Sequence, residues 1–278
     1  MDYSHFNPLT YHIVSVQSQV IYGTVGNNAA MPTLDDLGHR AIAVPSVLLS
    51  NTPFYGTNAG GIISDEWFAG YLRDIDLRGA IEPLRAIITG YLGAPSQALI
   101  LSDWIGEQRQ KHPEMIACID PVMGDSDSGL YVDPNLASAY RDTLIYAADI
   151  LTPNHFEVEY LTGGTPLTST KALVNGARSL LHDHLRALVV TSACLDDTPA
   201  DQISILIVTK DSVDSFHHPR VDCNVRGSGD TFNAALTAAL LDGKTLREAA
   251  EQAADYVIRA MRQTAADNLG ELLLPPRA

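Results

Sequence analysis

Short apolar runs alternate with longer amphipathic segments along most of the 278-residue chain, and this alternation limits the folds open to it. Apolar runs of this length are typical of buried strands, while apolar residues at helical spacing indicate helices that cover a core. Repeated strand–helix order predicts an α/β fold, a mostly parallel, doubly wound sheet with helices on both faces. Because ligands in such folds bind at the carboxyl ends of the strands, the functional residues are expected there.

The expected elements follow this order from the N-terminal to the C-terminal region. Parallel strands are expected at residues 12–16, 40–47, 86–89, 115–119, 149–151 and 187–191, and an antiparallel pair at 202–208 and 212–217. Helices are expected at 27–37, 64–73, 95–110, 135–146, 154–161, 170–184, 229–242 and 245–264. No Pro/Gly/Ser-rich linker or repeat interrupts the pattern, so one domain is expected over 11–278, preceded by a polar extension at 1–10.

The charge balance narrows the function classes. The chain has 18 Lys and Arg against 33 Asp and Glu, a net charge of −15, which argues against a nucleic-acid-binding protein. No apolar run approaches the roughly 20 residues of a membrane span, and the start lacks the apolar core of a secretory signal. The three cysteines are far apart in the sequence and fit reduced thiols. We therefore expect a cytoplasmic protein without a membrane segment.

The sharpest motif is Gly227-Ser228-Gly229-Asp230, placed directly before a long amphipathic segment. Glycines allow close backbone approach, and the N–H groups of a first helical turn form a binding site for anions such as phosphate. Asp230 has two interpretations, an N-cap carboxylate or a general base that accepts a proton from a hydroxyl group. The chain has no P-loop sequence.

Two further strand ends carry polar residues. Asp120-Pro121-Val122-Met123-Gly124-Asp125 places two carboxylates where Mg²⁺ could share them with a phosphate, although either could simply cap a turn. Asn154 and Glu157 have the spacing of a capping box at the start of a helix, and Glu157 could also order Mg²⁺ through water. Ser18 and the Thr191-Ser192 pair, at other strand ends, could bind a ligand or close a turn.

Together these segments resemble the pyridoxal kinase family of the ribokinase-like superfamily, over about residues 12–264. The segments that carry the resemblance, in order, are Ser15-Val16-Gln17-Ser18, Tyr22-Gly23, Val25-Gly26-Asn27, Ser50-Asn51, Tyr55-Gly56, Thr89-Gly90-Tyr91-Leu92-Gly93, 120–125, 149–154, Phe156-Glu157, Val190-Thr191-Ser192 and 227–230. The resemblance implies a three-layer α/β/α sandwich and transfer of the ATP γ-phosphoryl group to the 5′-hydroxyl of pyridoxal, and often of pyridoxine and pyridoxamine. It also implies a homodimer.

Carried over to this chain, the resemblance implies a role for each matching residue. Asp230 would accept the hydroxyl proton, and the backbone at 227–229 would bind the transferring phosphoryl group. Mg²⁺ and a monovalent cation, K⁺ or Na⁺, would be organised by Asp120, Asp125 and Glu157, the last two mainly through water.

The same resemblance implies a nucleotide side and an acceptor side of the site. The nucleotide side would comprise Asp120, Thr152, Asn154, Glu157, Thr191, Ser192 and Ser228, with His218, Pro219, Arg220 and Val221 covering the adenine. On the acceptor side, Ser18 would bond the pyridine nitrogen and Tyr131 would close over the ring. Val47, Pro53, Tyr91 and Asp230 would line the remainder.

One segment departs from the family pattern. The family usually has Val-Gln-Phe-Ser-Asn-His-Thr where this chain has Val-Leu-Leu-Ser-Asn-Thr-Pro at 47–53. Leu49 and Thr52 replace a Phe and a His that contact the ring, Pro53 replaces a Thr, and Asn58 replaces a Trp. The acceptor pocket therefore loses aromatic area, worth about 0.5–1.5 kcal/mol per aromatic contact, while the phosphoryl-transfer half is intact.

Two alternatives stay open at this point. The altered segment favours a related kinase for another hydroxymethyl compound, such as the hydroxymethylpyrimidine of thiamine synthesis. A non-catalytic pyridoxal-binding protein would not need the base at Asp230.

Overall fold

The structure, a computed structural model, describes residues 6–275. Half of the expected N-terminal extension, residues 1–5, lies outside the described residues, and residues 6–11 form no helix or strand. The division into an extension and one domain stays a prediction.

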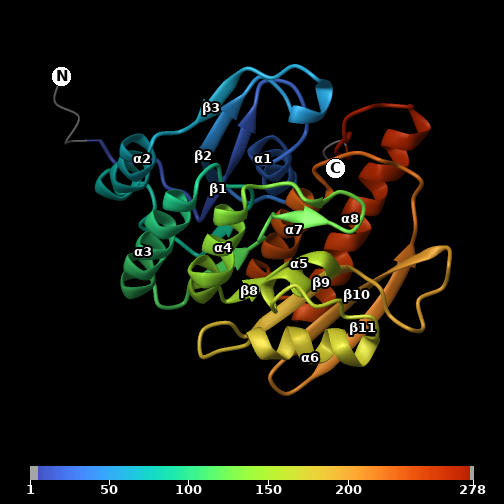
Figure 1. Cartoon of the computed structure of the whole chain (residues 1–278). Coiled ribbons are helices and arrows are strands. Elements are labelled where there is room, and N and C mark those ends of the chain that lie inside the picture. Colours follow the sequence, from blue (N-terminus) through green and yellow to red (C-terminus); the bar gives the residue numbers. More distant parts are fainter. Residues whose placement is uncertain (1–5, 276–278) are drawn as a thin grey trace.

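A mixed sheet forms the centre of the molecule (Figure 1). Over residues 6–275 it has nine strands in the order β11-β10-β9-β8-β5-β4-β1-β2-β3, parallel except at the edges, where β10 and β3 run antiparallel to their neighbours. The strands are β1 (Ile13–Val20), β2 (Ala41–Leu49), β3 (Gly60–Ile62), β4 (Ala86–Thr89), β5 (Ile116–Ile119), β8 (Ile150–Leu151), β9 (Ala187–Ala193), β10 (Gln202–Thr209) and β11 (Val213–Pro219). A separate hairpin pairs β6 (Gly124–Asp125) with β7 (Gly129–Leu130). The predicted α/β fold class is confirmed.

Helices cover both faces of this sheet and enclose two hydrophobic cores (Figure 1). One face carries α2 (Asp65–Leu77), α3 (Pro95–Lys111), α4 (Pro134–Asp142), α5 (His155–Leu161) and α6 (Thr170–Leu180). The other carries α1 (Asn27–Asp36), α7 (Ser228–Leu241) and α8 (Leu246–Ala266). Two 3₁₀ helices, η1 (Pro53–Tyr55) and η2 (Leu144–Ala147), complete the described elements. None of the described helices has the length and apolarity to cross a membrane.

Several expected boundaries were wrong for local reasons. The helix expected at 135–146 breaks at Thr143, whose φ of −138° and ψ of −65° leave the helical region, and a 3₁₀ turn follows. Strand β1 continues through Gln17, Ser18 and Gln19 because β2 pairs with it as far as Val20. The helix expected at 170–184 ends at Leu180, after which His182 accepts hydrogen bonds from the following turn. Short strands β3, β6 and β7 were not predicted.

The helix α7 is fixed over the carboxyl ends of two central strands by a buried side chain. Asn233 donates hydrogen bonds to the carbonyl oxygens of Thr89 on β4, at 3.0 Å, and of Cys118 on β5, at 3.4 Å. The N-terminus of α7 is thereby held at the edge of the sheet where polar strand ends converge.

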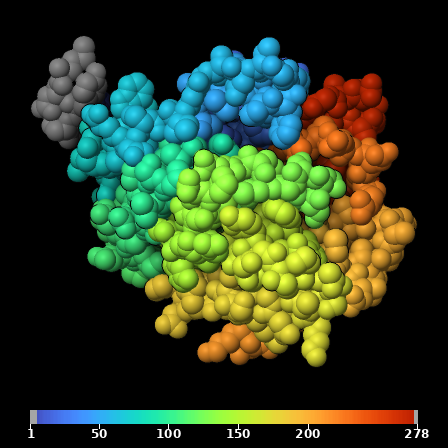
Figure 2. Space-filling model, in the orientation of Figure 1, coloured from blue at the N-terminus to red at the C-terminus, as the bar shows by residue number. Residues whose placement is uncertain are grey.

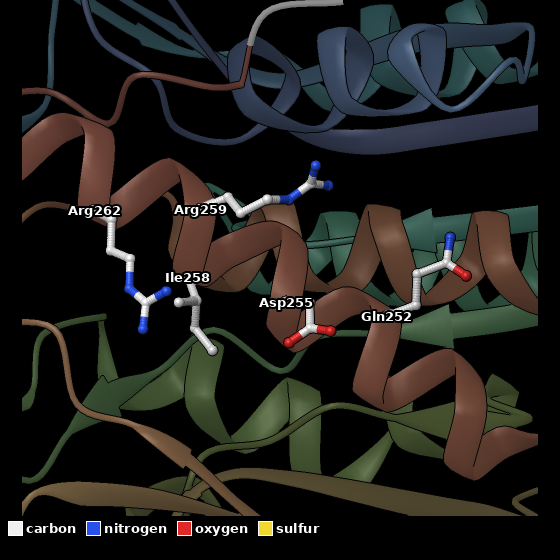
Figure 3. Close-up of a pocket in the computed structure, with 5 residues that line it drawn as sticks. All are labelled: Gln252, Asp255, Ile258, Arg259 and Arg262. Carbon is white, nitrogen blue, oxygen red and sulfur yellow. The ribbon is translucent and has the colours of Figure 1, made fainter. Parts of the chain in front are cut away.

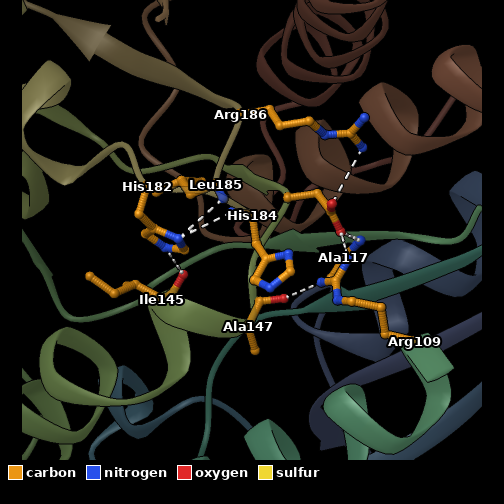
Figure 4. Close-up of polar contacts among 9 residues, drawn as sticks. Arg109, Ala117, Ile145, Ala147, His182, His184, Leu185 and Arg186 are labelled. Atoms are coloured by element: carbon orange, nitrogen blue, oxygen red, sulfur yellow. Dashed lines mark hydrogen bonds and ion pairs between the residues drawn. The ribbon is translucent and has the colours of Figure 1, made fainter. Parts of the chain in front are cut away.

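A buried carboxylate fixes the start of the short strand β8. Asp149 accepts hydrogen bonds from Arg109 at 2.9 Å, from Arg186 at 3.3 Å and from the backbone N–H of Ala117 at 2.9 Å. Arg109 also donates to the carbonyl of Ala147 (Figure 4). A two-residue strand has few ladder hydrogen bonds, so these side-chain bonds keep β8 between β5 and β9.

We expect Asp149→Ala to lower the free energy of unfolding by about 3–5 kcal/mol, because it leaves Arg109 without its buried partner. Urea unfolding followed by circular dichroism measures this effect. The matched control is Asp142→Ala, which breaks only the exposed pair with Arg141 and should cost less than about 1 kcal/mol. Equal losses in the two variants would contradict a special role for Asp149.

Candidate active site

The loop before α7 depends on a glycine that no other residue can replace. Gly227 is the N-cap of α7 with a φ of 93°, in the left-handed region. A Cβ at this position would lie 1.8 Å from the carbonyl oxygen of Thr24. The first-turn N–H groups of α7 have no acceptor within the helix, and the positive end of the helix dipole lies there. Residues 227–229 thus lie at a helix N-terminus whose geometry suits an anion, and their binding role stays a prediction.

Asp230 is not the N-cap of α7, so that interpretation is wrong. It is the third residue of the helix, and its Oδ2 accepts a hydrogen bond of 2.8 Å from the backbone N–H of Gly26. Burial raises the pKa of Asp230, and the hydrogen bond from Gly26 offsets only part of that shift. A carboxylate with a raised pKa and one fixed oxygen is a suitable proton acceptor.

Glycines keep side chains away from Asp230. A Cβ on Gly90 would lie 3.1 Å from Asp230 Oδ1 and 2.4 Å from Gln17 Oε1. A Cβ on Gly26 would lie 2.2 Å from Ser18 Oγ. Gln17 Oε1 is buried and has no hydrogen-bond partner in the described part of the chain. The predicted base Asp230, the predicted ring-nitrogen ligand Ser18 and the free acceptor Gln17 Oε1 therefore meet around Gly26 and Gly90, where a side chain would clash. Neither glycine was predicted to have this role.

Two of the carboxylates predicted for the nucleotide side are buried close to Asp230. Asp120 is 7% exposed and Glu157 is 2% exposed. Burial raises the pKa of Asp120 well above its ordinary value, and the charges of Glu157 and Asp230 raise it further. Burial also raises the pKa of Glu157, to about 7. Gly229 packs against the first of these, since a Cβ there would lie 3.3 Å from Asp120 Oδ2.

Glu157 forms the predicted capping box. Asn154 Oδ1 accepts from the N–H of Glu157 at 2.9 Å, and Glu157 Oε2 accepts from the N–H of Asn154 at 2.8 Å. The other oxygen of Glu157 accepts from the N–H of Met123 at 2.9 Å. The structural interpretation is therefore confirmed. A role toward Mg²⁺ stays a prediction, supported by the closeness of Glu157 to Asp120, whose pKa its charge raises.

Asp125 differs from the other carboxylates because it is paired. It lies on the β6–β7 hairpin and accepts from the N–H of Ser128 at 2.6 Å and from Arg226 at 3.0 Å. Burial would raise the pKa of Asp125, but these two partners outweigh it and lower the pKa. The guanidinium of Arg226 also lies 4.3 Å from the ring centroid of Phe54 in η1. Arg226 was not predicted, although it immediately precedes the glycine motif.

Tyr131 lies near this group of acids, and its role over the ring stays a prediction. Burial, followed by the charges of Glu157, Asp120 and Asp230, raises its pKa, so that Tyr131 keeps its proton. On the other acceptor positions, Tyr91 is half-buried and Val47 is buried in β2, whereas Pro53 is exposed at the start of η1. Tyr140 fixes the intervening loop by donating to the carbonyl of Gly90 at 2.7 Å.

The residues predicted for the ATP phosphates come from two neighbouring strand ends. Asn154 and Thr191 form an isolated parallel bridge beyond β8, and Thr191 N–H donates to Pro153 at 2.9 Å. Ser192, in β9, has a φ of 49°, a strained conformation for a residue with a side chain. Thr152 Oγ1 is buried without a hydrogen-bond partner among the described residues. This hydroxyl oxygen is thus available to bind a ligand at this edge of the sheet.

An open groove runs along α8, lined by Gln252, Asp255, Ile258, Arg259 and Arg262 (Figure 3). Helix α8 packs against β11, the strand that carries His218. Burial lowers the pKa of His218, and the charge of Asp255 on α8 raises it. His218 begins the segment predicted to cover the adenine, 218–221.

The carboxylates suit a magnesium ion only in part. Carboxylate oxygens are ligands that Mg²⁺ accepts, and the ion takes further oxygens from phosphates and water. Within residues 6–275, however, no three His, Cys, Asp or Glu side chains gather closely enough to hold a metal ion. Asp120 and Glu157 fit an ion that is completed by a nucleotide, and the roles of all three predicted metal residues stay predictions.

Comparisons with known proteins show the family of the chain. Residues 80–275 match the family model described as phosphomethylpyrimidine kinase. The chain is 47% identical over 270 residues to the pyridoxine/pyridoxal/pyridoxamine kinase of Bordetella avium (strain 197N), covering 97% of this chain and 91% of that protein. The chain belongs to the pyridoxal kinase family.

Solved structures of pyridoxal kinases have the same fold. The enzyme of Entamoeba histolytica superimposes with a TM-score of 0.87 at 22% identity, covering 95% of this chain and 92% of the other. The enzyme of Leishmania donovani, solved with ADP and pyridoxamine, gives 0.84 at 25% identity, covering 95% and 90%. The ribokinase-like architecture predicted from the sequence is thereby confirmed.

The pH dependence of the free energy of unfolding tests the raised pKa of Glu157 in this protein. A carboxyl whose pKa is raised from 4.5 to about 7 by folding stabilises the protein below pH 4.5 and loses that contribution as the pH rises toward about 7. We expect the free energy of unfolding to fall over this range, and Glu157→Gln to reduce the fall. Asp120 and Asp230 contribute with the same sign, so part of the fall remains.

Urea unfolding at a series of pH values measures this slope. The matched control is Glu248→Gln in the other capping box, at α8, where hydrogen bonds from Thr245 lower the pKa of Glu248. That control should leave the fall unchanged. A slope that is identical in wild type and Glu157→Gln would contradict the raised pKa.

Proposed function

We propose that this protein is an ATP-dependent kinase that phosphorylates the 5′-hydroxyl of pyridoxal, and of pyridoxine and pyridoxamine. The observation that carries the proposal is the Asp230 carboxylate, held by the Gly26 N–H at the N-terminus of α7 beside residues 227–229. It combines a proton acceptor and an anion site within one helical turn, which is what phosphoryl transfer to an alcohol requires. The 47% identity to a pyridoxine/pyridoxal/pyridoxamine kinase supports the choice of acceptor.

The proposed step uses the chain's own groups in a fixed order. The vitamer ring lies between Ser18 and Tyr131, with its 5′-oxygen at Asp230. As that oxygen attacks the γ-phosphorus, Asp230 takes its proton and the bond between the γ-phosphorus and the ADP oxygen breaks. The N–H groups at 227–229 stabilise the charge on the transferring group. Mg²⁺, held on the side of Asp120 and Glu157, would supply charge neutralisation to the phosphates.

The nucleotide is proposed to extend from α7 toward the groove on α8. Its phosphates lie against Thr152, Asn154, Thr191 and Ser192, and its adenine lies against residues 218–221. The free hydroxyl of Thr152 and the packing of α8 against β11, which carries His218, support this direction. A monovalent cation, K⁺ or Na⁺, is proposed for the same carboxylate group, with Asp125 acting through water.

Purified protein with ATP, Mg²⁺ and pyridoxal should form pyridoxal 5′-phosphate, which is detected by its absorbance. Asp230→Asn should lower kcat by about 10²–10⁴-fold, the usual contribution of a general base, while ADP and pyridoxal still bind. Because burial raises the pKa of Asp230, wild-type kcat should fall on acidification at a higher pH than for an ordinary aspartate. Absence of product from all three vitamers would overturn the proposal.

A second candidate is a kinase for hydroxymethylpyrimidine, favoured by the departure at 47–53. In the structure Thr52 is buried and Pro53 is exposed, so the segment offers the acceptor fewer polar groups than the family pattern. Consumption of ATP with each acceptor in turn separates the two candidates. A protein that binds pyridoxal and leaves ATP intact with every acceptor would instead be a binding protein.

We also propose that the protein is a homodimer in which a second copy covers the β2–β3 edge. Strand β3 ends the sheet there, and neighbouring large apolar side chains are exposed: Ile21, Tyr22, Leu48, Phe54, Ile62 and Trp67. Exposed edges and apolar patches of this kind mark interaction surfaces. The acceptor segment 50–57 borders this edge, so the dimer would shield it.

Leu48→Lys should raise the dimer dissociation constant about tenfold or more, because burial of one large apolar side chain contributes about 1.5–3 kcal/mol. Light scattering after gel filtration over a dilution series measures the change. Leu99→Lys, on an exposed apolar position of α3, is the matched control and should leave the mass unchanged. A monomeric wild type, or equal effects of the two variants, would contradict the proposed interface.

A further inference from the structure

The chain beyond α8 folds back toward the candidate site. Asn268 has a φ of 51°, which reverses the chain after the helix. The turn is fixed by Thr264, whose hydroxyl accepts from the N–H of Leu273 at 2.8 Å, and by Leu272, which is 2% exposed. The C-terminal segment (red) lies beside the segment around residues 50–60 (blue) in Figure 2. Glu271 is therefore held at a defined place rather than on a free tail.

The two oxygens of Glu271 bind two different segments. Oε2 accepts from the backbone N–H of Thr24 at 3.0 Å. Oε1 accepts from the hydroxyl of Tyr55 in η1. The hydrogen bond to Glu271 raises the pKa of Tyr55 to about 12, so the phenol stays protonated and donates at neutral pH. The contact with Glu271 also needs Gly23, where φ is 121° and a Cβ would lie 3.0 Å from Oε2.

Each of these segments leads to a different half of the site. The carbonyl oxygen of Thr24 lies against Gly227. Two residues later, the backbone N–H of Gly26 donates a hydrogen bond to Asp230. Tyr55 belongs to η1, which begins at the acceptor position Pro53, and its ring packs edge-on against Tyr22 with centroids 5.7 Å apart. One carboxylate from the end of the chain thus joins the turn behind the base to the segment over the acceptor.

We propose that Glu271 is a positioning residue. It fixes the turn that holds Asp230 relative to η1, the segment proposed to cover the acceptor. This inference rests on the proposed kinase function for its kinetic consequences and on the contacts of Glu271 alone for its structural ones. Glu271 does not touch the reacting atoms. It acts on Asp230 through Thr24 and Gly26, and on the vitamer through Tyr55.

The kinetic test separates the effects of the two hydrogen bonds that Glu271 accepts, from Thr24 and from Tyr55. Glu271→Ala should raise the vitamer KM and lower kcat, each by about tenfold, the scale of one hydrogen bond to a charged group, with the ATP KM unchanged. Tyr55→Phe keeps the bond to Thr24 and should raise the vitamer KM only. Glu271→Gln keeps an acceptor for Thr24 and an N–H for the Tyr55 oxygen, so it should rescue most of the loss. Asp267→Asn, which alters an exposed pair with Gln263 nearby, is the control and should match wild type.

Hydrogen exchange gives a readout that does not depend on catalysis. In Glu271→Ala, the amides of residues 22–26 and 51–57 should exchange faster together, and in Asp267→Asn neither should change. Faster exchange at both segments in a protein that phosphorylates no vitamer would refute the proposed function and leave the structural coupling intact. Wild-type exchange and kinetics in Glu271→Ala would overturn the inference. A lower kcat with unchanged vitamer KM, in proportion to the unfolded fraction, would also overturn it.

Discussion

The hydrogen bond from the Gly26 N–H to Asp230 joins the turn after the first strand to the N-terminus of α7. Residues 204 positions apart in the sequence meet there, and the conditions for that meeting are steric. Gly26 must lack a side chain to clear Ser18, and Gly227 must lack one to clear Thr24. A substitution at either glycine therefore displaces Asp230 as well as the loop. The position of α7 over β4 and β5 supplies the remaining constraint, through Asn233.

This arrangement places three acidic side chains close together with few positive charges near them. Asp120, Glu157 and Asp230 all have raised pKa values because burial disfavours their ionised forms. The dipole of α7 compensates part of this charge, and a cation bound with a nucleotide would compensate more. Arg226 is already paired with Asp125. A net charge of −15 is thus compatible with binding a phosphate ester, because backbone N–H groups and a metal ion would meet the phosphates in place of a basic surface.

The sequence was sufficient for the parts of the fold that local chemistry determines. Alternating apolar runs predicted the central strands, and the capping box at Asn154 and Glu157 was found at its predicted position. Asp230 was correctly placed at the start of α7, but its cap interpretation failed because Gly227, with its left-handed backbone, occupies the cap. Contacts between distant segments left no local signal. Neither the pairing of Arg226 with Asp125 and Phe54 nor the approach of Gly90 to Asp230 could be inferred from spacing.

Contacts between distant segments also hold the segment at 47–53 and the residues after it, where the sequence differs from the family pattern. The segment lacks the Phe and His of the family pattern, yet it is attached to the rest of the site at two places outside the pocket. Phe54 packs under the guanidinium of Arg226, which is itself bonded to Asp125, and Tyr55 is bonded to Glu271. Contacts from the protein itself thus hold this segment before any ligand binds. A segment fixed in this way loses less conformational entropy when a ligand binds, which offsets part of the lost aromatic contact.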